Sequence, residues 1–330
     1  MARKQRSNGL EPIVLAAHTI THLVRVLREA LFWWPTDNLR AIIGLFRDLR
    51  HPAGMYSEIN MLHIHSWAGL RRLLSYLLEA FLLPFGLKRK LKNINNMAGY
   101  LDSPDFLFVP GDPDYQDEAW FFVNGVANDQ DLALQSGHYI ASLFRRPLTV
   151  VANPTGAILP DLLAVTLQKG FHTMSSSGQR LYEQLRRELQ NERIQRIIVL
   201  AHSQGAVILA RVLHALQSEG SLPLQRLECY TFGNPADRMQ AGSGFAANQQ
   251  PWLEHFANQK DLVARLGVIA WRAVARGDIQ IDGRIFLDDR YGHFLNEHYL
   301  SGIELQSYRS QGSSNSQPRL YAYLNGGRPV

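Results

Sequence analysis

The stretch Arg196-Ile-Ile-Val-Leu-Ala-His-Ser-Gln-Gly205 decides the fold. Its apolar first part has the pattern of a short buried strand, and an apolar helical segment follows the last residue directly. Ser203 lies at the junction, with small residues two positions before and after it, Ala201 and Gly205. This pattern predicts a nucleophile elbow, a sharp strand-to-helix turn that exposes the serine oxygen. A serine that only caps the helix is the alternative interpretation.

Short apolar runs alternate with helical patterns on both sides of this stretch. The runs occupy residues 119–123, 148–152, 196–201, 227–232 and, more weakly, 252–257; the helical patterns occupy 131–143 and 181–190. Strands that are apolar throughout and alternate with helices are typical of a parallel sheet covered on both faces. We therefore expect an α/β fold with a mostly parallel sheet flanked by helices.

The first hundred residues have a different character. Apolar side chains recur at steps of three and four residues, which predicts helices at about 12–34, 38–50 and 66–83. Asn, Gly, Asp and Pro then concentrate at 93–113, which predicts a boundary. We expect an N-terminal helical region over residues 1–100, an α/β catalytic domain over 101–306, and a flexible Ser-, Gln-, Asn- and Gly-rich segment over 307–330.

The positive charge of the chain lies in this N-terminal region. Residues 1–100 hold 14 Lys and Arg against 6 Asp and Glu, whereas the remainder holds 20 against 23. No helix-turn-helix, zinc-finger or RNP pattern accompanies the basic excess, so we expect no nucleic-acid partner. The apolar run 73–87 between basic clusters favours helices that lie on a peripheral membrane surface. Helices that simply pack on the catalytic core are the alternative.

Composition limits the remaining classes. Of the 330 residues 46% are hydrophobic and 19% charged, which excludes wholesale disorder. The single cysteine, Cys229, excludes a disulfide scaffold, and neither zinc-ligand spacing nor any other metal or cofactor motif is present. No uninterrupted apolar stretch reaches the roughly 18 residues of a membrane span, and no convincing secretory signal begins the sequence. We expect a cytoplasmic protein, with peripheral membrane attachment left open.

The elbow and its context resemble the α/β-hydrolase superfamily, and most closely its lipase-type serine esterases, including the class 3 lipases. The resemblance covers roughly residues 105–303. The sequence departs from the family at Ala201, where glycine is commoner, and at Asn124-Gly125, where many members have His-Gly. Neither change removes the chemistry, because the first position needs only small size and the second supplies backbone donors.

The resemblance implies an acid and a histidine downstream of the serine, in that order. Asp261, followed by a Val-x-Arg-Leu turn, resembles the acid segment of class 3 lipases, and Asp237 is the alternative. His293, with Tyr291 before it and Glu297 four residues after it, resembles their base segment, and His298 is the alternative. We interpret His202, beside the serine, as a lining residue.

An oxyanion formed at the serine needs two backbone N–H donors. The residue directly after the nucleophile, Gln204, is expected to provide one of them. The other is expected from the turn that follows Phe121-Phe-Val-Asn-Gly125, at Gly125 or Val126. A plain strand-ending turn is the alternative, because Asn-Gly also suits one.

The resemblance implies a serine hydrolase that cleaves a carboxylic ester, with a small-molecule or lipid-like ester as substrate. A thioesterase or amidase would use the same residues, and a non-catalytic docking module on a hydrolase-like fold is the competing hypothesis. A fluorophosphonate label on Ser203 separates the enzyme from the docking module.

Overall fold

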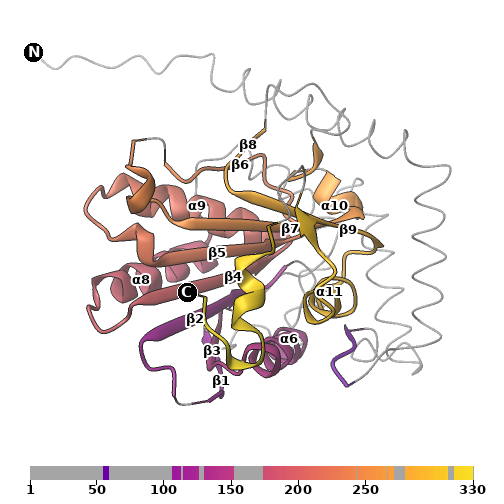
Figure 1. Cartoon of the computed structure of the whole chain (residues 1–330). Coiled ribbons are helices and arrows are strands. Elements are labelled where there is room, and N and C mark those ends of the chain that lie inside the picture. The colour runs from indigo at the N-terminus through magenta and orange to yellow at the C-terminus, as the bar shows by residue number, and fades with distance from the viewer. Residues whose placement is uncertain are drawn as a thin grey trace, which may run out of the picture.

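A central sheet organises the part of the chain that the computed structural model describes: residues 55–58, 106–112, 114–125, 130–151, 174–242, 244–265, 267–270, 279–310 and 316–329. The helices predicted at 12–34, 38–50 and 66–83, and the apolar run 73–87, lie outside these residues. The sheet has eight strands in the order β1-β3-β2-β4-β5-β7-β9-β10 (Figure 1).

The six inner strands of the sheet are parallel, and the two edge strands are antiparallel to their neighbours. In chain order the eight are β1 (Phe106–Val109), β2 (Glu118–Val123), β3 (Leu148–Val151), β4 (Arg196–His202), β5 (Leu227–Phe232), β7 (Trp252–Lys260), β9 (Arg284–Tyr291) and β10 (Arg309–Ser310). A separate pair, β6 (Arg238–Met239) and β8 (Gln280–Ile281), lies beside the sheet.

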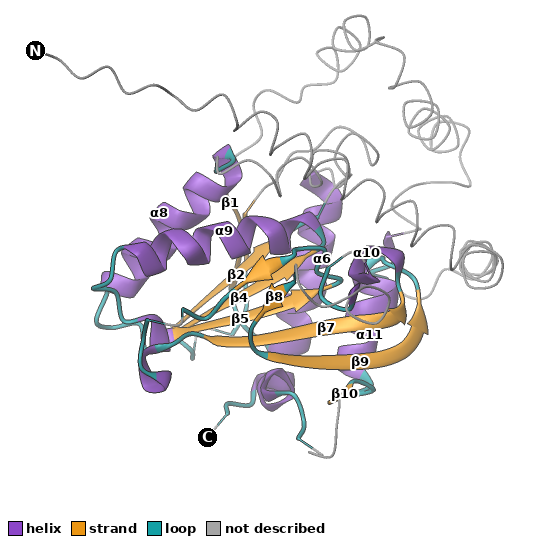
Figure 2. Ribbon diagram, turned by 90° about the horizontal axis from the view of Figure 1, so that it is seen from above, coloured by secondary structure: helices purple, strands orange, loops and turns teal. Residues whose placement is uncertain are grey.

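Helices cover both faces of the sheet, as Figure 2 shows for α8 and α9 on one side. The described long helices are α6 (Gln130–Phe144), α8 (Ser176–Gln190) and α9 (Gln204–Ser218). The short ones are α10 (Leu262–Arg265), α11 (Ser301–Glu304), the π-helix η8 (Leu295–Leu300) and the 3₁₀ helices η4 (Leu224–Arg226), η5 (Ala247–Gln249) and η9 (Arg319–Gly326).

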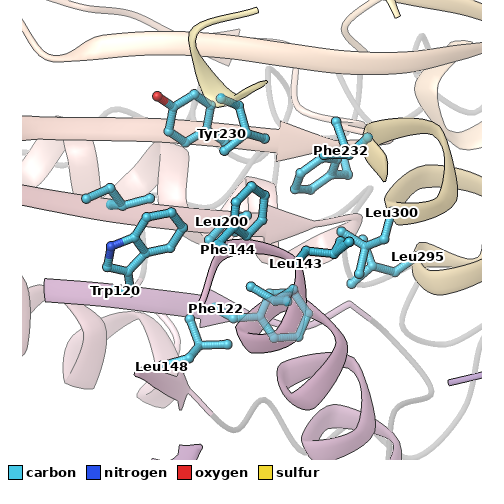
Figure 3. Packing of buried hydrophobic residues seen from close by; sticks show 14 of the residues in the cluster. Trp120, Phe122, Leu143, Phe144, Leu148, Leu200, Tyr230, Phe232, Leu295 and Leu300 are labelled. Carbon is cyan, nitrogen blue, oxygen red and sulfur yellow. The ribbon is translucent and has the colours of Figure 1, made fainter. Parts of the chain in front are cut away.

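Alternate side chains of the strands fill two separate cores, because successive residues of a strand point to opposite faces. One core packs Phe121, Val123 and Val199 against α8 and α9. The other packs residues such as Trp120 and Phe122 against α6, η8 and η9 (Figure 3). β4 is buried on both faces, which explains its uninterrupted apolar run and places its carboxyl end at the middle of the sheet.

The predicted α/β architecture is confirmed, and the predicted runs match β2, β3, β4, β5 and β7 closely. The other three strands of the sheet, β1, β9 and β10, escaped the sequence analysis. β1 alternates exposed and buried residues at an edge, and β9 carries charged residues over much of its length. Charged residues interrupt the apolar sequence of β9. β1 is an apolar run of four residues, but it lies within the predicted boundary at 93–113.

The end of the chain differs from the flexible segment predicted over residues 307–330. Residues 309–310 form β10, and η9 packs with Leu320, Tyr321 and Tyr323 buried. Buried carboxylates at the start of two strands hold η9: Glu254 accepts hydrogen bonds from the main-chain N–H of Arg319 (2.8 Å) and of Leu320 (3.3 Å), and Glu228 accepts one from the Tyr323 hydroxyl (2.9 Å). The Ser- and Gln-rich composition hid these aromatic anchors.

Glu254 makes folding stability depend on pH. Burial raises the pKa of its carboxyl from 4.5 to about 7, against the opposing effect of the Arg319 and Leu320 N–H donors. The native state therefore holds this proton more tightly than the unfolded chain does, and the free energy of unfolding falls as pH rises from about 4.5 to about 7. The Gln side chain in Glu254→Gln does not titrate. Between these two pH values the free energy of unfolding of the wild type is therefore expected to fall by up to about 3 kcal/mol relative to that of the variant.

Urea unfolding at pH 4.5 and pH 7.5 measures this difference directly, with exposed Glu192→Gln as the matched control. The control is expected to follow the wild type at both pH values. Parallel pH dependence in wild type and Glu254→Gln would show that folding does not raise the pKa of this carboxyl.

Candidate active site

Ser203 stands on a strained turn between β4 and α9. Its backbone has φ 55° and ψ −122°, a conformation that residues other than glycine rarely adopt. The main-chain N–H of Ser203 donates to the carbonyl of Phe232 (3.0 Å), which fastens the turn to the end of β5. The strain is the local feature that an elbow requires, because the turn holds the hydroxyl out from the end of the strand.

The small residue after the serine has a packing reason. A Cβ added to Gly205 would lie 2.3 Å from the carbonyl oxygen of Val123, so only glycine lets α9 approach the end of β2 this closely. The helix α9 begins at Gln204, directly after Ser203. The positive end of a fifteen-residue helix thus lies beside the serine, where it favours negative charge.

Three of the predicted residues form one hydrogen-bonded chain. His293 Nε2 lies 2.8 Å from Ser203 Oγ, and His293 Nδ1 lies 2.7 Å from Asp261 Oδ2. Since a carboxylate only accepts, Nδ1 carries the hydrogen, and Nε2 of the neutral ring is left as the acceptor for the serine hydroxyl. This tautomer is the one in which a histidine can remove a proton from the serine.

Asp261 is held as a charged group in a buried place. Burial alone would raise the pKa of its carboxyl, but His293 and the hydrogen bonds that it accepts outweigh burial, so the pKa is lowered. The Tyr299 hydroxyl donates to Oδ2 (2.6 Å), and the main-chain N–H of Val263 donates to Oδ1 (2.8 Å). Both carboxylate oxygens are therefore fixed, which orients the one that faces His293.

The alternative histidine, His298, braces the loop that carries His293. Its Nδ1 accepts a hydrogen bond from the main-chain N–H of Phe294 (3.0 Å), and its ring stacks on Phe294 with centroids 5.6 Å apart. A Cβ on Gly292 would lie 2.4 Å from the same ring. The π-helix η8 begins at Leu295, so His293 lies on the loop before it.

The alternative acid, Asp237, lies elsewhere. It precedes β6, and its carboxylate interacts electrostatically with Arg211. Its main-chain carbonyl accepts from Gln280 N–H (2.7 Å) beside the small β6–β8 pair. The carboxylate that contacts the His293 ring is that of Asp261.

One predicted oxyanion residue lies against the serine. A Cβ on Gly125 would come within 2.9 Å of Ser203 Cβ, so the turn that follows β2 lies directly beside the serine. Gln204, the other predicted donor, follows Ser203 directly and is the first residue of α9. Val126, the alternative donor, lies outside the described residues.

A short segment from the first hundred residues reaches the element that follows His293. Glu58 Oε1 accepts from the main-chain N–H of Asn296 (2.7 Å), and the Asn296 side chain donates to the carbonyl of Tyr56 (2.8 Å). The Tyr56 ring stacks on Tyr139 of α6 with centroids 4.9 Å apart. Residues 55–58 thus contact both η8 and α6.

One contributor escaped the sequence analysis, and a second makes a contact that its predicted lining role did not include. Tyr299 lies six residues after His293, a spacing with no motif attached, and only the fold brings its hydroxyl to Asp261. His202 was interpreted as a lining residue, yet its Nε2 lies 2.8 Å from the main-chain carbonyl of His293. A histidine next to a nucleophile is the only signal that sequence offers for this contact.

The described residues contain no group of three or more His, Cys, Asp or Glu side chains that could hold a metal ion. Among the helices of the described ranges, none combines the length and the apolar character needed to cross a bilayer.

Together these features define the fold class. A parallel strand leads through a strained serine turn into a helix, and an aspartate and a histidine follow later strands in the order Ser, Asp, His. The chain has an α/β-hydrolase fold.

Comparison with known proteins gives remote matches only. No protein-family profile matches the chain, and no curated protein sequence matches it significantly. Similar solved structures include the Francisella virulence factor BioJ (12% identity, 63% of this chain and 83% of that one, TM-score 0.34). Another is the type II thioesterase BorB from the borrelidin biosynthetic cluster (16% identity, 58% of this chain and 90% of that one, TM-score 0.35). A third is a bacterial heroin esterase (12% identity, 60% of this chain and 81% of that one, TM-score 0.31).

Proposed function

We propose that the protein is a serine hydrolase that cleaves carboxylic esters through an acyl-enzyme. The observation that carries the proposal is the continuous chain from Ser203 Oγ through the His293 ring to Asp261 Oδ2, with links of 2.8 Å and 2.7 Å. A serine hydroxyl is a weak nucleophile until a base takes its proton, and that base needs an orienting acid. The three groups supply these functions in the order and geometry that acyl transfer needs.

In the proposed mechanism Ser203 Oγ attacks the ester carbonyl while His293 Nε2 takes the hydroxyl proton. The main-chain N–H groups of Gln204 and of the turn at Gly125 or Val126 stabilise the oxyanion of the tetrahedral intermediate. His293 then gives the proton to the leaving alcohol, and an acyl group remains on Ser203. Water, activated by the same ring, releases the acid and restores the serine.

Asp261 keeps His293 in the productive tautomer throughout this cycle. Asp261→Asn is expected to lower kcat by a factor on the order of 10²–10⁴ while the protein stays folded, because an amide that donates to Nδ1 reverses the tautomer. Steady-state hydrolysis of a short p-nitrophenyl ester measures the loss, with circular dichroism as the check on folding.

Asp237→Asn is the matched control, since it makes the same isosteric change in the other candidate acid. Near wild-type turnover is expected for this variant. An inactive Asp237→Asn beside an active Asp261→Asn would move the acid to the loop after β5.

The substrate is proposed to be lipid-like. The support comes from the sequence, in the apolar and basic character of residues 1–100, which suits a surface that meets acidic lipids. The experiment is a screen of p-nitrophenyl esters with graded acyl chain lengths, with Ser203→Ala run in parallel. Turnover that rises with chain length supports a lipid-like substrate, and turnover confined to acetate and propionate contradicts it.

A further inference from the structure

His202 occupies a position that links two parts of the candidate active site. It is the last residue of β4, next to Ser203, and its side chain is buried. Nε2 lies 2.8 Å from the main-chain carbonyl of His293. Because a carbonyl oxygen only accepts, the hydrogen of the His202 ring is on Nε2, and the ring holds the backbone of the residue proposed as the base.

The ring is neutral as well as buried. Burial, followed by the proximity of His293, lowers the pKa of His202 to about 3. The bond to the His293 carbonyl and the charge of Asp261 raise this pKa, and His298 lowers it, but these effects are smaller than that of burial. The Nε2–H tautomer is therefore the form of His202 over the ordinary pH range.

The ring also lies against the side chains of the site. Its centroid is 4.7 Å from that of His293, with an angle of 33° between the planes, and 5.9 Å from that of Tyr299, which donates to Asp261. Its Nδ1 would lie 3.2 Å from a Cβ on Gly125. The His202 ring is therefore close both to the His293 ring and to the turn that follows β2.

We propose that His202 is a positioning residue for acyl transfer, which holds the main chain and the ring of His293 in line with Ser203. The proposal rests on the proposed function for its kinetic consequences. Its physical basis is that a hydrogen bond to the backbone of the base fixes the ring's position as well as its rotation. A displacement of about 1 Å in such a group can lower turnover on the order of 10²-fold.

Glutamine and asparagine variants of His202 distinguish the loss of the hydrogen bond to the His293 carbonyl from the effect of burying an amide at this position. The glutamine amide can reach the place of Nε2 and donate to the His293 carbonyl, whereas the shorter asparagine amide cannot. His202→Asn is expected to lower kcat by about 10- to 100-fold with KM changed by less than about twofold. His202→Gln is expected to recover most of that loss, although both variants bury an amide.

His255 provides the matched control. It is equally buried on β7, its Nε2 contacts a main-chain carbonyl, that of Asp282, at 2.9 Å, and burial lowers its pKa to about 4. Its partners are Thr231 and Asp282, away from the Ser203–His293 pair. His255→Asn is expected to lower Tm while kcat stays near the wild-type value.

The proton NMR signal of His293 Nδ1–H in its bond to Asp261 gives a second measurement that needs no substrate. We expect a low-field resonance in wild type, His202→Gln and His255→Asn, assigned by its absence from His293→Ala, and its loss to exchange broadening in His202→Asn. Unchanged kcat and an unchanged resonance in His202→Asn overturn the proposal, as does a glutamine variant as impaired as the asparagine variant. If the wild type has no esterase activity but His202→Asn still loses the resonance, the proposed function is overturned while the positioning role of His202 stands.

Discussion

Replacing Ser203 with alanine is expected to lower ester hydrolysis by about 10³-fold or more and to abolish labelling by a fluorophosphonate. The change removes one oxygen atom at the elbow between β4 and α9, and a smaller residue fits the same strained turn. Folding should therefore persist while the acyl-enzyme can no longer form. The measurements are steady-state turnover of a short p-nitrophenyl ester, gel detection of the label, and Tm.

Ser218→Ala is a suitable control, because that serine ends α9 and donates its hydroxyl to the His214 carbonyl within the helix (2.8 Å). Wild-type turnover and full labelling are expected for it. Turnover in Ser203→Ala comparable to the wild type would mean that another group is the nucleophile.

Replacing His293 with alanine is expected to be as damaging as replacing Ser203. The ring connects the serine at 2.8 Å with the carboxylate at 2.7 Å, so its loss breaks both links. Residues that act as one unit are non-additive, and the Ser203→Ala/His293→Ala double variant should be no slower than either single variant. Turnover of the three proteins, measured with the same ester, tests this directly.

His298→Ala is the informative comparison, because this histidine supports the loop rather than the serine. It accepts from Phe294 N–H and packs against Gly292, so its removal loosens the loop and is expected to lower turnover by only about tenfold. If His298→Ala proves inactive and His293→Ala active, the base is His298.

The strands that could be predicted from the sequence are those that are buried along most of their length, because burial on both faces requires mostly apolar residues. β4 is buried on both faces, so its central residues are all apolar. β5 is also buried throughout and is mostly apolar, apart from Glu228 and Thr231. The partly exposed β9 tolerates charged residues, which break its apolar run. The edge strand β1 is apolar but only four residues long, and it lies within the predicted boundary at 93–113. The C-terminal η9 was missed for a related reason, because its anchors are buried glutamates on distant strands.

The candidate site divides in the same way. Ser203 was identifiable because local geometry demands small neighbours, and the contact between Gly205 and Val123 gives the physical reason. Asp261 and His293 were chosen through a family resemblance, since no local pattern places an acid beside a base 32 residues away. Tyr299 joins the site only through a tertiary contact with Asp261, which one sequence does not encode as a motif. His202 is placed at the site by its position beside Ser203, but its contact with the His293 carbonyl is tertiary as well.

The most direct test of the account is to trap the acyl-enzyme and locate the acyl group. The protein is mixed with excess p-nitrophenyl butyrate, quenched in acid within the first turnover, digested and analysed by mass spectrometry. The account predicts one butyryl group on the peptide that contains Ser203, and none on that peptide from Ser203→Ala. An active protein that carries the group on another residue, or that turns over the ester with no adduct at any quench time, would contradict the central claim.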